Sequence, residues 1–150
     1  MVISRLHIDR IEENLSLIQE FLSELKRLSE IPEDEFFRDK RNPAAAESYL
    51  RRSLEAVFDI GRHILSKSYG FKEIEYKKIA MELGDRGIVD KEYAKTLLKM
   101  AGYRNRMVHV YHEVTPQEIY NILQRHLSDI EHFISEIVRF IESYKRETSD

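Results

Sequence analysis

The chain has 150 residues, which is enough for one domain with its own hydrophobic core. It contains no cysteine, so disulfide bonds, thiolate metal sites and thiol nucleophiles are excluded. Charged residues make up 34% of the chain and the formal net charge is −3, which argues against a general nucleic-acid coat protein and leaves only a local basic pocket for such chemistry.

The first predicted element is a long amphipathic helix between Arg5 and Ser29. Apolar residues recur there at alternating spacings of three and four, which places them on one face of a helix. Ile31-Pro32 ends this helix, and we expect the charged segment 33–41 to be a loop.

A second helix is predicted to begin at Asn42-Pro43 and to end before Gly70. Asparagine is a favoured helix cap and proline is tolerated at the first helical position. The spacing of the apolar residues predicts an inward face made of Ala46, Tyr49, Leu50, Ser53, Leu54, Val57, Ile60 and Ile64.

Three further helices complete the predicted order. A short helix covers about 73–83 and stops at the glycine-flanked segment 84–87, and Asp90 is a plausible cap for the next one. The segment Thr115–Glu118 is typical of a capping box, with proline inside it. One last helix is predicted to continue from there to about Tyr144. No strand pattern competes, so we expect an all-α, up-and-down bundle of about five helices.

The chain carries an R-x-x-x-x-H-x-Y motif from Arg104 to Tyr111. Alternation of apolar and polar residues in 108–114, together with β-branched valines, favours extended backbone, so the preceding helix should end near Val108. His109 and Tyr111 should then point to one side.

These residue types suit metal-independent cleavage of a phosphodiester. Imidazole transfers protons near neutral pH, and guanidinium binds phosphate through paired hydrogen bonds. Each residue also has a structural alternative: a salt bridge at a helix end for Arg104, a satisfied half-buried side chain for His109, and a core or interface aromatic for Tyr111. A metal site is not expected, because the segment lacks an H-E-x-x-H arrangement and any further ligand cluster.

Asp59 and His63 are four residues apart on the second predicted helix, so their side chains share a face. They either form a carboxylate–imidazole pair near the cleft or belong to a polar seam between helices. We favour the structural interpretation.

Several segments together resemble the HepT-like branch of the HEPN superfamily. They are Leu54–Ile64, Gly87-Ile88-Val89, and Met100–Tyr103 leading into the motif and the capping box. The resemblance covers most of the chain from about Asn42 onward, and it implies a single HepT-like domain over 1–150.

The resemblance implies a homodimeric, all-α ribonuclease toxin of a type VII toxin–antitoxin pair. In this family Arg104 and His109 would be the catalytic pair and Asn105 a supporting polar residue. Tyr111 matches the tyrosine that a partner nucleotidyltransferase antitoxin modifies with AMP to silence the toxin. Lys99 and Arg106 are close enough in sequence to contact the RNA backbone. No cofactor is implied.

Three classes of function therefore stay open. The first is the metal-independent RNA endonuclease just described. The second is a non-catalytic module that holds nucleotide or substrate for the nucleotidyltransferase, and the third is a purely structural dimerisation domain. No apolar run approaches the roughly 20 residues of a membrane span and no apolar signal segment is seen, so we expect a cytoplasmic protein without membrane association.

Overall fold

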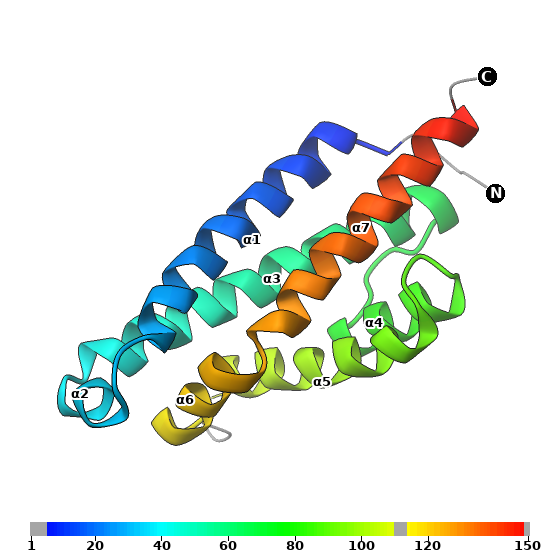
Figure 1. Cartoon of the computed structure of the whole chain (residues 1–150). Coiled ribbons are helices and arrows are strands. Elements are labelled where there is room, and N and C mark those ends of the chain that lie inside the picture. The colour runs from blue at the N-terminus through cyan, green and yellow to red at the C-terminus, as the bar shows by residue number, and fades with distance from the viewer. Residues whose placement is uncertain (1–5, 110–113, 149–150) are drawn as a thin grey trace.

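The computed structural model describes residues 6–109 and 114–148, and within them it contains seven helices and no strand. The long helices α1 (Ile8–Ser29) and α3 (Arg41–Tyr69) pack along each other, and α7 (Leu127–Thr148) also packs on α1 (Figure 1). The predicted all-α fold is confirmed, but the predicted count of about five helices is wrong.

One extra helix, α2 (Glu33–Arg38), occupies the segment that was expected to be a loop. Its side chain Phe36 is fully buried, and the Phe36 ring lies 5.2 Å from that of Tyr120 between centroids. The predicted cap of the next helix is also wrong, because α3 already begins at Arg41. The side-chain Nδ2 of Asn42 instead donates a hydrogen bond to the backbone carbonyl of Glu35 at 3.4 Å.

The second extra helix arises because the predicted last helix is two. It is divided into α6 (Pro116–Arg125) and α7, with His126 between them at φ −123°. Helix α6 packs against α1 and α3, whereas α7 packs along α1. The break allows each helix to turn its own apolar stripe toward its own neighbours.

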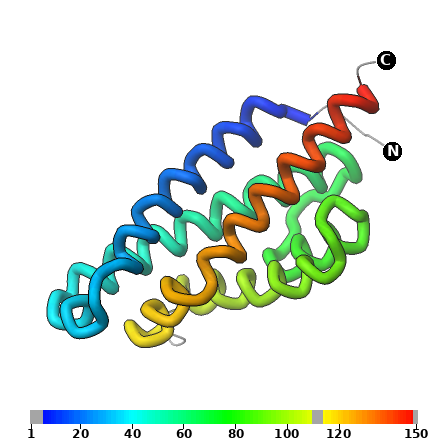
Figure 2. The backbone as a smooth tube through the Cα atoms, viewed as in Figure 1, coloured from blue at the N-terminus to red at the C-terminus, as the bar shows by residue number. Residues whose placement is uncertain are grey.

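The antiparallel pair α4 (Tyr76–Asp85) and α5 (Lys91–Val108) packs on the other side of α3, as the tube in Figure 2 shows. Gly61 allows α3 and α4 to approach closely, because a Cβ atom there would lie 2.7 Å from Ile79 Cγ2. Gly84 does the same between α4 and α5, where a Cβ would lie 2.5 Å from that of Ala94. The following turn contains Gly87 at φ 70°, in the left-handed region that favours glycine.

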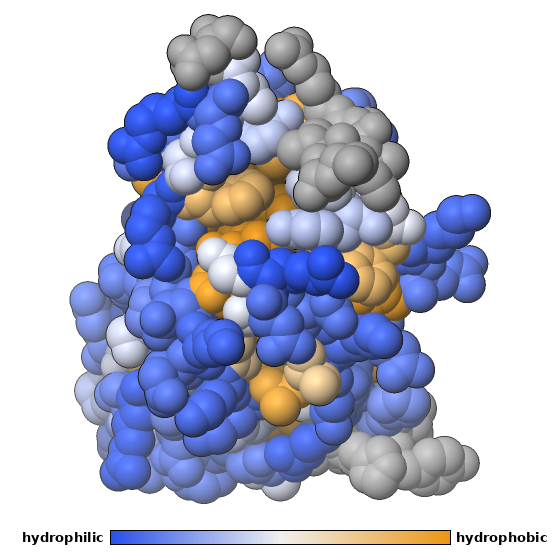
Figure 3. Space-filling view, turned by 90° about the vertical axis from the view of Figure 1, so that its right-hand side faces the viewer, coloured by the Kyte–Doolittle hydropathy of each residue, from blue (hydrophilic) through white to orange (hydrophobic). Residues whose placement is uncertain are grey.

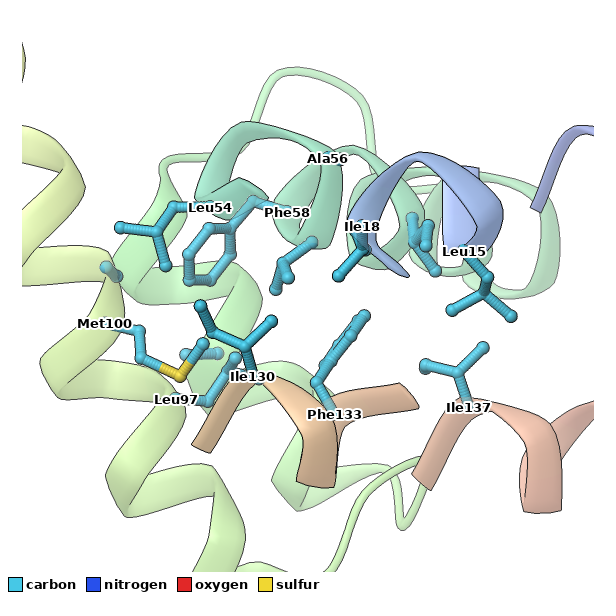
Figure 4. Close-up of a cluster of buried hydrophobic side chains, with 14 of the residues drawn as sticks. Leu15, Ile18, Leu54, Ala56, Phe58, Leu97, Met100, Ile130, Phe133 and Ile137 are labelled. Atoms are coloured by element: carbon cyan, nitrogen blue, oxygen red, sulfur yellow. The ribbon is translucent and has the colours of Figure 1, made fainter. Parts of the chain in front are cut away.

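Side chains from all of the long helices contribute to one hydrophobic core. Figure 4 shows Ile18 of α1, Phe58 of α3, Met100 of α5 and Phe133 of α7 converging on one apolar layer. Seven of the eight residues predicted for the inward face of the second helix are buried, and Tyr49 is half-buried. Burial of this apolar surface is the main force that holds the bundle together.

Hydrophilic side chains cover most of the face shown in Figure 3, with apolar side chains visible between them. No helix of the described part of the chain is long and apolar enough to cross a membrane.

Candidate functional site

The motif begins on the last turns of α5 and leaves the helix at the predicted place. Asp90 caps the start of α5 as expected, since its carboxylate accepts a hydrogen bond from the Glu92 amide at 3.1 Å. The helix ends at Val108, and His109 has extended backbone at φ −96° and ψ 121° with an exposed side chain. Tyr111 lies outside the described residues, so its predicted orientation beside His109 stays a prediction.

An ion pair joins the last turn of α5 to the first turn of α6. Arg106 donates two hydrogen bonds to the Glu118 carboxylate, at 2.8 and 2.9 Å. Glu118 also belongs to the predicted capping box, because its amide donates to Thr115 Oγ1 at 3.2 Å and its carboxylate accepts from the Thr115 amide at 3.4 Å. The hydrogen bond from Arg106 lowers the pKa of Glu118, which favours the charged, pairing form.

Arg104 extends the buried stripe of α5 toward α3 and α4. Its guanidinium lies over the ring of Tyr76, with Cζ 4.2 Å from the ring centroid, and Nη2 lies 3.9 Å from Glu55 Oε1. Within residues 6–109 and 114–148, the buried Nε atom of Arg104 has no hydrogen-bond partner. Arg104 is therefore held by an aromatic face and a carboxylate, which agrees with its structural alternative, and its catalytic role stays a prediction.

His109 and Asn105 line one hollow of about 440 Å³, which we call the cationic hollow. Its other lining residues are Lys77, Lys99, Gly102, Tyr103 and Arg106. The structure thus brings together His109, Asn105 and the two cations expected to contact RNA. Lys77 was missed, because only the packing of α4 on α5 brings it to the motif.

Arg104 is not among the residues that line the cationic hollow. Its guanidinium nevertheless contacts Tyr76, the neighbour of Lys77 in the first turn of α4. Arg104 therefore packs against the turn of α4 that also carries Lys77, but its guanidinium does not line the hollow that contains His109.

His109 also lines a second hollow, of about 550 Å³, which we call the apolar hollow. Its walls come from α3, the end of α5 and the start of α6, and they are Lys40, Pro43, Ala44, Glu47, Met107, Val108, Val114, Pro116 and Ile119. Nothing in the sequence pattern indicated this hollow, since its residues are distant in the chain. His109 therefore lines two hollows, one with several basic side chains and one with mainly apolar side chains.

Asp59 and His63 do not pair with each other. Asp59 lies 3.5 Å from Arg62, whereas His63 Nε2 accepts a hydrogen bond from the backbone amide of His7 at 3.1 Å. Burial, followed by the charge of Arg10, lowers the pKa of His63. His63 therefore fastens the start of α1 to α3, in agreement with the structural interpretation of this pair.

A family model described as "Ribonuclease HepT-like" matches residues 11–137. The chain belongs to the HepT-like family. The resemblance inferred from the sequence is thereby confirmed, and it covers α1 as well as the later helices.

Two curated relatives carry the family name. The chain is 28% identical to a tRNA nuclease HepT of Aphanizomenon flos-aquae over 91% of this chain and 93% of that one. It is 32% identical to an mRNA nuclease HepT of Shewanella oneidensis over 59% of this chain and 66% of that one.

Solved structures share the fold. A tri-AMPylated Shewanella oneidensis HEPN toxin in complex with its MNT antitoxin superposes with a TM-score of 0.79 at 24% identity, covering 87% of this chain and 98% of that one. The Bacillus subtilis cytosolic protein YutE, of unknown function, superposes with a TM-score of 0.77 at 19% identity, covering 96% and 95%. At these identities the likeness shows the fold alone.

Proposed function

We propose that this chain is a metal-independent endoribonuclease, the toxin of a toxin–antitoxin pair. The observation that carries the proposal is the position of His109, exposed at the end of α5 beside a hollow that also contains Lys77, Lys99 and Arg106. An imidazole next to clustered cations suits proton transfer at a bound phosphate. The nuclease names of the HepT relatives support the same activity.

In the proposed reaction the RNA supplies its own nucleophile. The 2′-hydroxyl loses its proton and attacks phosphorus, the bond from phosphorus to the 5′ oxygen breaks, and that oxygen takes up a proton. The products are a 2′,3′-cyclic phosphate and a 5′-hydroxyl. His109 acts as the base or as the acid, and the second proton transfer falls to His109 of a second copy in a homodimer.

The remaining motif residues stabilise charge and orientation. The cations of the hollow hold the phosphate. The role proposed for Arg104 is to stabilise the negative charge that grows on phosphorus, from its position against Tyr76 in the first turn of α4. Asn105 shares the hollow with His109 from the previous turn of α5, so its amide orients the imidazole or the substrate.

We further propose that a cognate nucleotidyltransferase silences the protein by attaching AMP to Tyr111. The modification adds a phosphate and bulk two residues from His109, which would fill the hollow and repel the RNA phosphate. The AMPylated HEPN toxin bound to its antitoxin supports this regulation by likeness of fold. We take the whole chain, 1–150, as one such domain, acting in the cytoplasm.

Cleavage of RNA by the purified protein in excess EDTA tests the activity. We expect cyclic or 3′-phosphate ends, loss of cleavage in His109→Ala, and normal cleavage in the matched control His126→Gln. Loss of activity in EDTA that a divalent ion restores would contradict the metal-independent reaction. Growth arrest on expression, relieved by His109→Ala, tests toxicity in the cell.

Mass spectrometry tests the regulation. After co-production with the neighbouring nucleotidyltransferase, the peptide that holds Tyr111 should gain mass in multiples of AMP, and the gain should vanish in Tyr111→Phe. An unmodified peptide in a stable complex would contradict this proposal.

The cationic hollow also favours a second candidate, a non-catalytic module that holds nucleotide for the partner enzyme. A phosphate-binding hollow is required in both cases. Tight nucleotide binding by a wild-type protein that neither cleaves RNA nor arrests growth would favour this second function.

A further inference from the structure

The two hollows on either side of His109 differ in the ligand chemistry that they suit. The cationic hollow presents Lys77, Lys99 and Arg106, of which Arg106 is already paired with Glu118. The apolar hollow is lined mainly by apolar residues, from Pro43 and Ala44 of α3 to Ile119 of α6, with Lys40 and Glu47 as its charged residues. Because both hollows include His109, one ligand with a charged part and an apolar part can occupy both of them.

We propose that the apolar hollow binds the nucleobase of the nucleotide whose phosphate lies in the cationic hollow. The proposal rests on the proposed function, which it deepens by naming a base-binding subsite and the residues that select the base. A nucleobase has apolar faces and a polar edge, and it is joined through ribose to a phosphate. The base would lie in the apolar hollow and the phosphate in the cationic hollow beside it.

The size and walls of the apolar hollow fit a planar base. Its volume of about 550 Å³ lies within the 300–1,000 Å³ typical of small-molecule sites. The rings of Pro43 and Pro116 and the side chain of Ile119 present flat or branched carbon surfaces. A base that enters removes this apolar surface from water, which favours binding without selecting one base over another.

Two charged residues of the apolar hollow can form hydrogen bonds with the polar edge of the base. Glu47 offers carboxylate oxygens, which accept hydrogen bonds from the amino groups of adenine, cytosine and guanine. Its ion pair with Arg51, at 3.7 Å, is half-exposed and weak, so the carboxylate is available to a ligand. Lys40 donates to carbonyl oxygens instead. Uracil has no amino group and donates only through its ring N3–H, so we expect Glu47 to favour the amino-bearing bases over it.

A base bonded to a phosphate can reach this site from two sources. It comes either with the RNA substrate or as the adenine of an AMP group on Tyr111, two residues from His109. The chemistry of the subsite is the same in both cases, so the experiment needs one arm for each source.

The first arm measures base binding without using cleavage. The methyl groups of Met107 and Ile119 are followed by NMR while the protein is titrated with AMP, CMP, UMP or ribose 5-phosphate. We expect the nucleotides to shift both methyl signals and ribose 5-phosphate to leave them unchanged. This result holds even if the chain cuts no RNA, so failure of the nuclease proposal and failure of this one are distinguishable.

The second arm measures base preference in RNA cleavage. Glu47→Gln replaces one carboxylate oxygen by an N–H donor, so it should reduce the preference for amino-bearing bases over uracil at the cleaved position about tenfold, equivalent to about 1.4 kcal/mol. Ala44→Phe fills the hollow and should raise KM more than it lowers kcat. Glu20→Gln and Leu17→Phe, exposed on α1 outside both hollows, are the matched controls.

The outcomes separate the sources and decide the proposal. A changed base preference assigns the subsite to RNA. An unchanged preference, together with a shift of the Met107 and Ile119 methyl signals when Tyr111 is modified, assigns it to the attached adenine. The proposal is overturned if ribose 5-phosphate shifts these methyl signals as much as the nucleotides do, or if neither nucleotides nor modification shift them.

Discussion

The guanidinium of Arg104 lies over the ring of Tyr76, with its Cζ atom 4.2 Å from the ring centroid. The Tyr76 ring is itself stacked on Phe58, with centroids 5.1 Å apart and planes 12° apart. A cation over an aromatic face is attracted by the ring's negative charge, and Phe58 is fully buried, so the ring that supports Arg104 cannot easily move. The motif arginine is thus positioned by a helix that contributes nothing to the motif itself.

Replacing Tyr76 tests this positioning. Tyr76→Ala removes the ring beneath Arg104, and we expect kcat for RNA cleavage to fall about tenfold, in line with about 1–2 kcal/mol for a desolvated cation–π contact. Tyr76→Phe keeps the aromatic face and should keep most of the activity. Steady-state kinetics of both variants check the prediction, and equal losses of kcat in the two would contradict a role for the ring face.

The capping box at Thr115 should contribute measurably to stability. Thr115→Ala leaves the Glu118 amide without its side-chain acceptor, which costs about 1 kcal/mol at a helix start. Thr115→Ser keeps the hydroxyl and should cost much less. Urea unfolding of the three proteins measures the difference. An alanine variant as stable as wild type would mean that a hydrogen bond to water replaces the Thr115 hydroxyl without any loss of stability.

The close contact of α3 with α4 should make Gly61 intolerant of a side chain. A Cβ there would lie 2.7 Å from Ile79 Cγ2 and 2.9 Å from Leu83 Cδ1, so Gly61→Ala should destabilise the protein by about 1–3 kcal/mol. The control is Gly102→Ala on α5, where a Cβ meets nothing within 4 Å. That change should stabilise by about 0.5–1 kcal/mol. Thermal or urea unfolding showing the same sign for both would contradict the packing argument.

Stability should fall as the pH drops below about 6.5, in part because of His63. Burial lowers the pKa of His63 in the folded protein, and its neutral Nε2 accepts the His7 amide hydrogen. The unfolded chain therefore binds the proton more readily than the folded one. The stabilising contribution of neutral His63 is fully present above the pKa of histidine in the unfolded chain, near 6.5. It is lost as the pH falls from there toward the lower pKa of His63 in the folded protein.

Urea unfolding at pH 7.5 and 5.5 checks the His63 prediction. His63→Gln keeps a hydrogen-bond acceptor that does not titrate, so its stability should change less between the two pH values than that of wild type. The exposed residue His126 provides the control, and His126→Gln should retain the wild-type loss. An identical loss in His63→Gln and wild type would mean that other groups cause it.

Much of the local structure could be predicted from the sequence, because its signals lie within a few residues. The apolar spacing of 5–29 predicted α1, the Thr115–Glu118 pattern predicted a capping box that is present, and the alternation after Val108 predicted the end of α5. The motif residues were identified in the same way. Their proposed roles depend on geometry that short-range patterns do not contain.

Contacts between distant segments determined what the sequence did not reveal. The charged segment 33–38 is helical because Phe36 packs against Tyr120, more than 80 residues away in the chain. Likewise, α4 brings Tyr76 to Arg104 and Lys77 to His109, and α3 and α6 together enclose the apolar hollow. Periodicity and caps act along one helix, so the sequence determined most of the helices and the motif, but not α2 or the break between α6 and α7. The surroundings of the motif depend on how the helices pack, which only the tertiary structure decided.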